Sequence, residues 1–278
     1  MNKLSIEKRA QVVGCLVEGM SIRSTVRITG AAKNTVTKLV VELGGACADY
    51  MDKTFHDLPC KRIQCDEIWS FCYAKEKNVP EEHKGELGYG DVWTWTALCA
   101  DTKLIPSFMV GDRDAQHGNA FMQDLASRLK NRVQLTTDGY KVYIEAVEGA
   151  FGSEIDYAML IKVYGNEKDA DKSAAKRYSP AECTEARPIP ITGKPEEKHI
   201  STSYVERQNL TMRMSMRRFT RLTNGFSKKI ENHYFATALY FMYYNFGRIH
   251  KTLRVTPAME AGISDHVWSF EEIADLIK

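Results

Sequence analysis

Three acidic residues in distinctive segments could together do metal-dependent chemistry. Asp66 lies in CDEIWSF, Asp138 in TTDGY and Glu206 in SYVERQN, far apart along the chain, so only the fold could bring them together. Clustered carboxylates repel one another, and binding hard divalent cations is the natural way to keep them ionised. Two such ions about 4 Å apart, Mg²⁺ or Mn²⁺, would stabilise the attacking and leaving oxygens of a phosphodiester displacement.

Each acid also has an ordinary explanation. Asp66 could be an edge-strand residue beside Glu67, which points to the opposite face of the strand and is left out of the predicted site. Asp138 and Gly139 form a common turn pair. Glu206 could be the partner of an arginine on a surface helix. The catalytic reading depends on the three occurring together.

The segment 203–219 (SYVERQNLTMRMSMRRF) is predicted to be one helix with two stripes. At about 100° per residue, Val205, Met212, Met216 and Phe219 form the apolar stripe. Glu206, Asn209, Arg213 and Arg217 form the stripe beside it, so Asn209 and Arg213 could support the acid or bind phosphate. We expect Glu206 to be a metal ligand. The arginines expected to hold the DNA backbone around it are Arg207, Arg213, Arg217 and Arg218.

Charge is unevenly distributed along the 278 residues, although the net charge is only +2. Residues 1–43 carry seven Lys/Arg against three Glu, and residues 201–254 carry ten against two. The stretch 44–200 and the last residues, 255–278, are net acidic. Two basic regions around an acidic middle are typical of a protein that binds a polyanion while keeping carboxylates for another purpose.

Cysteine usage and hydropathy favour a cytoplasmic, nucleoid-associated protein. The seven cysteines include no Cys-x-x-Cys pair, which argues against a zinc ribbon and for free thiols in a reducing compartment. No apolar run approaches the ~20 residues of a membrane span, and the first residues do not resemble a signal peptide. We therefore expect no membrane partner.

The amino-terminal 44 residues are predicted to form an all-α helix-turn-helix domain. Ser5 and Ser21 can cap the first two helices, and a third helix is expected from about Asn34 to Gly44-Gly45. A three-helix bundle that binds nothing is the alternative. If the third helix enters the major groove, its leading residues contact DNA; these are Lys33, Asn34, Thr35, Thr37 and Lys38.

The remainder is predicted to be α/β. Residues 45–60 are expected to be a helical linker, 61–250 a ribonuclease-H-like catalytic domain with a mixed five-stranded sheet, and 251–278 a helical tail. Period-two alternation begins at 62–73, and further strands are expected at 92–100, 104–110, 133–138 and 155–164. Trp69, Trp93 and Trp95 are expected in the sheet core rather than as base-stacking platforms. The polar, proline-containing stretch 165–200 is expected to be a long loop.

These segments resemble the DDE transposases of the insertion-sequence-one family. The matching blocks are CDEIWSF, GDVWTWTALCADTKLIPSFMVGDRD, TTDGYKVY, SYVERQNLTMRMSMRRFTRLTNGFSKK and YNFGRIHKTLRVTPAMEAGI. The resemblance implies catalytic Asp66, Asp138 and Glu206, and an amino-terminal helix-turn-helix that reads the element's ends. It implies metal-dependent cleavage and strand transfer on double-stranded DNA by a homodimer or higher oligomer. Some members carry a zinc finger first, and residues 1–43 could not form one. An inactive or domesticated DNA-binding regulator is the alternative.

Overall fold

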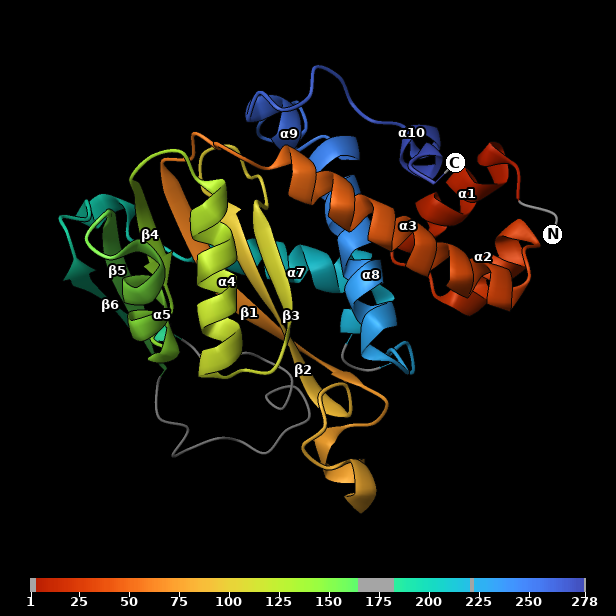
Figure 1. The fold of residues 1–278 in the computed structure, drawn as a ribbon, viewed down its shortest axis with the longest axis horizontal. Coiled ribbons are helices and arrows are strands. Elements are labelled where there is room, and N and C mark those ends of the chain that lie inside the picture. The colour runs from red at the N-terminus through yellow and green to blue at the C-terminus, as the bar shows by residue number, and fades with distance from the viewer. Residues whose placement is uncertain (1–3, 165–182, 221–222, 278) are drawn as a thin grey trace.

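The amino-terminal region consists of three helices, and the first two begin at the expected serine caps. A computed structural model describes residues 4–164, 183–220 and 223–277 (Figure 1). Helix α1 spans Ile6–Val17 and helix α2 spans Ile22–Thr29, each capped by a serine side chain. Gly30 ends α2 with φ 71°, a left-handed conformation that favours glycine. After a three-residue turn, helix α3 begins at Lys33.

Helix α3 does not end at Gly44-Gly45, so the expected break between a third helix and a separate helical linker is wrong. It continues as one 22-residue helix, Lys33–Thr54. The glycines serve packing instead. A Cβ on Gly44 would lie 2.2 Å from the backbone oxygen of Phe235, on helix α8 (Ile230–Met242). Gly44 therefore allows α3 and α8 to approach closely, and neither glycine stops the helix.

A mixed sheet forms the centre of the protein (Figure 1). Its strands are β1 (Arg62–Cys72), β2 (Gly90–Cys99), β3 (Ser107–Gly111), β4 (Val133–Thr137), β5 (Ile155–Tyr164) and β6 (Cys183–Thr192). The order across the sheet is β3-β2-β1-β4-β5-β6. Strands β1 to β3 form an antiparallel meander, and β4 and β5 run parallel to β1. The α/β class is as predicted, and the arrangement fits a ribonuclease-H-like core.

The sheet has six strands rather than the expected five, because part of the expected loop is strand β6. This strand pairs antiparallel with β5 at the edge of the sheet. Nearly all its residues are exposed, so it has no alternation of apolar and polar residues to reveal it. Pro188 and Pro190 are tolerated there because an edge strand needs hydrogen bonds on one side only. Residues 165–182 of the expected loop lie outside the described residues.

Helices cover both faces of the sheet. Trp95 of β2 packs on Phe121 of α4 (Ala115–Arg128) and on Tyr143 of α5 (Val142–Phe151). On the other face, Phe108 of β3 packs on Phe241 of α8, and α7 (Ser203–Ser215) crosses β1 and β2. Figure 1 shows α4 and α5 on one side of the strands and α7 and α8 on the other.

Helix α7 is shorter than predicted. It ends at Ser215 and is followed by a 3₁₀ turn, Arg217–Phe219. The apolar stripe nevertheless packs as expected, with Val205, Met212, Met216 and Phe219 all buried. Further 3₁₀ turns span Glu76–Asn78, Glu81–His83 and Glu197–His199, and a π-helical turn, Tyr243–Gly247, extends α8.

The carboxyl-terminal helices return to the amino-terminal ones. Helix α9 spans Pro257–Glu260, and α10 spans Phe270–Asp275 with the predicted capping box of Ser269 and Glu272. Arg9 of α1 donates hydrogen bonds to the carbonyls of Ala274 and Ile277. Within the described ranges, no helix has the length and apolar character that crossing a bilayer requires.

Candidate functional site

Strand register brings Asp66 and Asp138 together. Strands β1 and β4 are parallel neighbours, and the last paired residues are Gln64 and Thr136. Asp66 and Asp138 each lie two positions further along, at the point where β4 ends. The Asp138 side chain is oriented by its own turn, because its Oδ1 accepts a hydrogen bond from the Tyr140 amide at 2.9 Å. The predicted pairing of the first and fourth strands therefore accounts for this half of the site.

Glu67 joins these two acids. Carboxylate oxygens of Asp66, Glu67 and Asp138 all lie within 4.8 Å of one another. Although neighbouring residues of a strand point to opposite faces, Asp138 lies beyond the end of β4, where no strand backbone separates the two faces. Sequence reasoning excluded Glu67 on alternation alone. The one available signal was its position directly beside Asp66.

The three acids form a set of oxygen donors that fits a hard divalent cation. Burial raises the pKa of Asp66 to about 7, and the charges of Glu67 and Asp138 add to that rise. Burial likewise raises the pKa of Glu67, and the guanidinium of Arg113 offsets part of the effect. Glu67 Oε1 is buried and makes no hydrogen bond within the described residues. A bound divalent cation would stabilise the ionised form of these carboxylates.

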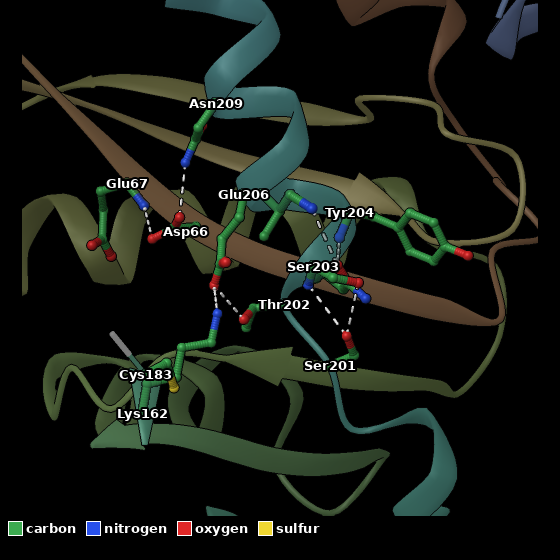
Figure 2. A network of polar contacts seen from close by, with 12 residues as sticks. Asp66, Glu67, Lys162, Cys183, Ser201, Thr202, Ser203, Tyr204, Glu206 and Asn209 are labelled. Atoms are coloured by element: carbon green, nitrogen blue, oxygen red, sulfur yellow. Dashed lines mark hydrogen bonds and ion pairs between the residues drawn. The ribbon is translucent and has the colours of Figure 1, made fainter. Parts of the chain in front are cut away.

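Helix α7 is attached to β1 at two points, one on each side of Glu206 (Figure 2). The buried Gln64 side chain accepts hydrogen bonds from the amides of Tyr204 at 2.9 Å and Val205 at 3.1 Å. One turn past Glu206, Asn209 Nδ2 donates to Asp66 Oδ2 at 2.8 Å. Gln64 therefore satisfies two amides in the first turn of α7. Asn209 fixes the distance between α7 and Asp66 on β1.

Glu206 lies near the acids but is not part of their 4.8 Å group. Its Oε1 forms an ion pair with Lys162 on β5 and accepts a hydrogen bond from the Thr202 hydroxyl at 2.6 Å. Its charge still contributes to the raised pKa of Asp66. Figure 2 shows the Glu206 side chain extending from α7 toward Lys162. The structure thus brings two of the three predicted acids into contact and places the third beside them with a lysine partner.

Arg113 is a further residue of the site that sequence reasoning did not identify. Its Nε donates to Glu67 Oε2 at 3.2 Å, and its Nη2 lies 3.8 Å from Asp138 Oδ2. The guanidinium stacks between two rings, 3.9 Å from the centroid of Tyr140 and 5.0 Å from that of Trp93. It is the cation that offsets part of the negative charge of the acids.

The predicted DNA-contacting residues differ in their surroundings. In the first turns of α3, Lys33, Asn34, Thr35 and Lys38 are exposed and Thr37 is half-buried. Around α7, Arg207 and Arg217 are exposed and Arg213 is half-buried.

Arg218 points into the protein, where its Nη1 donates to Ser227 Oγ at 2.5 Å. Burial lowers its pKa to about 10. A phosphate-binding role for these residues stays a prediction, and the placement of Arg218 favours a structural role.

A second group of potential ligands consists of Asp112, Asp114 and His117. Its contacts have a structural explanation. Asp114 caps α4, where its Oδ1 accepts from the His117 backbone amide at 2.9 Å and contacts His117 Nδ1 at the same distance. This pattern is ordinary for a helix N-cap.

No protein-family model matches the sequence, and no curated protein matches it. Among solved structures, the chain is similar to piggyBac transposase in its synaptic complex with hairpin DNA. That match has 11% identity and a TM-score of 0.39, and covers 99% of this chain and 70% of the other. The chain is also similar to the Mos1 strand transfer complex, with 10% identity and a TM-score of 0.25 over 86% of this chain and 78% of the other. At these TM-scores, the inference of function depends on the geometry of the acids.

Proposed function

We propose that this protein is a DDE transposase, which cleaves DNA at the ends of an insertion sequence and joins them to a target. The observation that carries the proposal is the meeting of Asp66 and Asp138 at the end of β4, with Glu206 on the helix above. Carboxylates placed together in this way suit metal-dependent phosphoryl transfer. The resemblance of the sequence blocks around all three acids to the insertion-sequence-one family supports the same assignment.

Asp66, Asp138 and Glu206 are the proposed metal ligands, and Glu67 is a fourth candidate. Bound Mg²⁺ or Mn²⁺, two ions in the proposed site, would activate the attacking oxygen and stabilise the leaving one. The protein's own contribution is positioning. Gln64 and Asn209 hold α7 over β1, and Arg113 holds Glu67 and Asp138 close to one another. Lys162 pairs with Oε1 of Glu206, so an ion bound at that oxygen would compete with the lysine.

The proposed DNA contacts are divided between two regions. The exposed first turns of α3 suit groove entry, since polar side chains there can reach base edges. Around α7, the exposed Arg207 and Arg217 suit the phosphate backbone. Joining two ends requires at least two copies at the DNA, so we infer a homodimer or higher oligomer in the bound state.

A domesticated regulator that binds DNA without cutting it is the second candidate. The observation that favours it is the ion pair between Lys162 and Glu206, the third acid. The two candidates share DNA binding and differ in chemistry. They are therefore separated by measuring cleavage and binding on the same duplex.

The test uses a duplex made from the genomic DNA that flanks the gene, where inverted repeats are expected for an insertion sequence. Asp66→Asn, Asp138→Asn and Glu206→Gln each remove one negative charge with little change in size. We expect binding in EDTA to be close to parental and strand cleavage in Mg²⁺ to fall by at least about 100-fold, as when a key electrostatic contribution is lost. A parental protein that binds the ends and never cleaves them is the regulator. Full cleavage by Glu206→Gln would exclude Glu206 from the site.

A further inference from the structure

The face of β1 that carries Glu67 continues to the carboxyl end of the strand, where an open pocket lies. The pocket has a volume of about 640 Å³, and its walls include Phe71, Tyr73 and Phe226. The β1–β2 hairpin extends beyond helices α4 and α5, so neither of these two helices covers this part of the face (Figure 1). Phe71 and Phe226 are half-buried and Tyr73 is 37% exposed, which leaves aromatic surface accessible to a ligand.

The aromatic rings form a continuous row. Trp69 and Phe71 have centroids 5.9 Å apart, and Phe71 and Phe226 have centroids 4.8 Å apart at an interplanar angle of 33°. At the near end of the row, Trp69 pairs across the strands with Trp93, whose ring contacts Arg113 at the acids. Phe71 lies four residues from Glu67, about 13 Å along the strand. The row therefore leads from the acid site to the pocket.

Three lysines lie beside the rings. Lys75 and Lys77 line the pocket, and Lys228 Nζ lies 4.7 Å from the Phe226 centroid and 5.7 Å from that of Tyr73. The intervening Glu76 turns to the backbone, where its Oε2 accepts from the Asp91 amide at 3.1 Å. Asn224 adds an exposed amide at the rim. Aromatic faces with lysines and amides at their edges are the composition of a nucleic-acid strand-binding surface.

We propose that this pocket, with Trp69 leading to it, binds unpaired nucleotides of a DNA strand that extends from the acid site. The inference rests on the proposed function for the identity of the nucleic acid. Stacking requires bases that are free of a duplex, because paired bases bury their faces against one another. The lysines suit the phosphates between those bases. An apolar peptide would gain less from three clustered lysines, so a nucleic acid is the better occupant.

The experiment measures the affinity of the full chain for a fluorescein-labelled oligo-dT and for a duplex of the same length, in EDTA at fixed salt. Phe226→Leu and Phe71→Leu keep apolar volume and remove the stacking face. We expect each to weaken oligo-dT binding about tenfold, within the range for loss of one stacked base, and to leave duplex binding within about twofold. Phe226→Tyr keeps a ring and should bind nearly as the parent does.

Charge is tested on the same hairpin. Lys75→Ala and Lys77→Ala, made singly, should each weaken oligo-dT binding and lower its salt dependence. Lys84→Ala is the matched control, because Lys84 is an exposed lysine of the hairpin paired with Glu81 and outside the pocket. Thermal melts verify that every variant is folded. Equal weakening by the control, or by both kinds of DNA, would overturn the proposal.

Omitting metal separates this inference from the proposed function. A chain that never cleaves DNA but loses oligo-dT affinity in the phenylalanine variants supports the pocket and refutes the transposase. A chain that cleaves DNA, with oligo-dT affinity unchanged in those variants, refutes the pocket alone. Binding of a proline-rich peptide that oligo-dT does not displace would also overturn the assignment to a nucleic acid.

Discussion

Asn209 donates a hydrogen bond to Asp66 at 2.8 Å, and this contact ties helix α7 directly to strand β1. It occurs one turn after Glu206, while Gln64 holds the helix by the amides of Tyr204 and Val205 just before Glu206. Glu206 is therefore carried on a helix fixed at both sides. Its position relative to Asp66 is set by two polar side chains rather than by apolar packing alone.

Removing the first of these attachments should impair chemistry more than binding. Gln64→Ala leaves two amides of α7 without their acceptor, so we expect cleavage to fall about 10- to 100-fold, as when residues that orient metal ligands are lost. DNA affinity in EDTA should change little. Gln134→Ala is the control, because Gln134 lies on the adjacent strand and also bonds a backbone, that of Glu196, away from the acids. Similar losses in both variants would indicate general destabilisation.

Lys162 should compete with metal for Glu206. Lys162→Met removes the competing cation and keeps most of the apolar side chain, so cleavage should reach half its maximum at a lower Mg²⁺ concentration. Lys198→Met is the control, since Lys198 pairs with Glu196 on the surface. Titrating Mg²⁺ in a cleavage assay measures the effect. An unchanged or higher Mg²⁺ requirement in Lys162→Met would argue that Glu206 does not bind the ion.

The raised pKa of Asp66 should make stability depend on pH. Its value in the fold is about 7, above the roughly 3.9 of an unfolded chain, so the native state holds a proton that the unfolded state releases. The contribution to stability is complete below about pH 4 and is lost as pH rises through 7. Between pH 5 and 8 we expect the unfolding free energy of the parent to fall by roughly 2 kcal/mol relative to Asp66→Asn.

Urea denaturation in EDTA at several pH values measures that difference. Subtracting the curve of Asp66→Asn removes the groups common to both proteins. Mg²⁺ should reduce the loss at high pH, since the ion binds the ionised carboxylates. A difference that stays constant with pH would mean that Asp66 is ionised throughout the range.

Two adjacent glycines should respond oppositely to alanine. In Gly44→Ala the new Cβ would lie 2.2 Å from Phe235 O and 2.6 Å from its carbonyl carbon, so α3 and α8 must separate. We expect a loss of about 2 kcal/mol or more in unfolding free energy, typical of overpacking. In Gly45→Ala the Cβ meets only the Phe235 ring at 3.6 Å, and the better helix former should add up to about 1 kcal/mol. Chemical denaturation of the two variants compares them directly.

Local signals in the sequence were sufficient for much of the fold. The span of β5, the capping box at Ser269 and Glu272, and the pairing that joins Asp66 to Asp138 all follow from periodicity, capping and strand order. Strand β6 was missed because an exposed edge strand with prolines has no alternating pattern. The sequence predicts a break in α3 because Gly44 and Gly45 are typical of a helix end. In the structure, the packing of α8 requires a small residue at Gly44.

The missed site residues depend on tertiary geometry. Glu67 meets Asp138 because β4 ends at Thr137, one residue before Asp138. The alternation of side chains along a strand does not predict such a contact. Arg113 follows β3, and nothing near it in sequence indicates that it will lie between the rings of Trp93 and Tyr140. Both residues reach the acids through contacts between segments distant in the chain.

Because α3 is continuous, it fixes the distance between its first turn and the half that packs on α8. A helix of 22 residues is about 33 Å long at 1.5 Å per residue, close to one turn of duplex DNA. Its first turn carries the proposed base-reading side chains, and its second half is packed on α8. In the proposed complex, the length of α3 would then set the number of base pairs between the recognised sequence and the cut phosphate. Each residue inserted into α3 would rotate the proposed base-reading side chains by about 100° around the helix axis, relative to the half packed on α8.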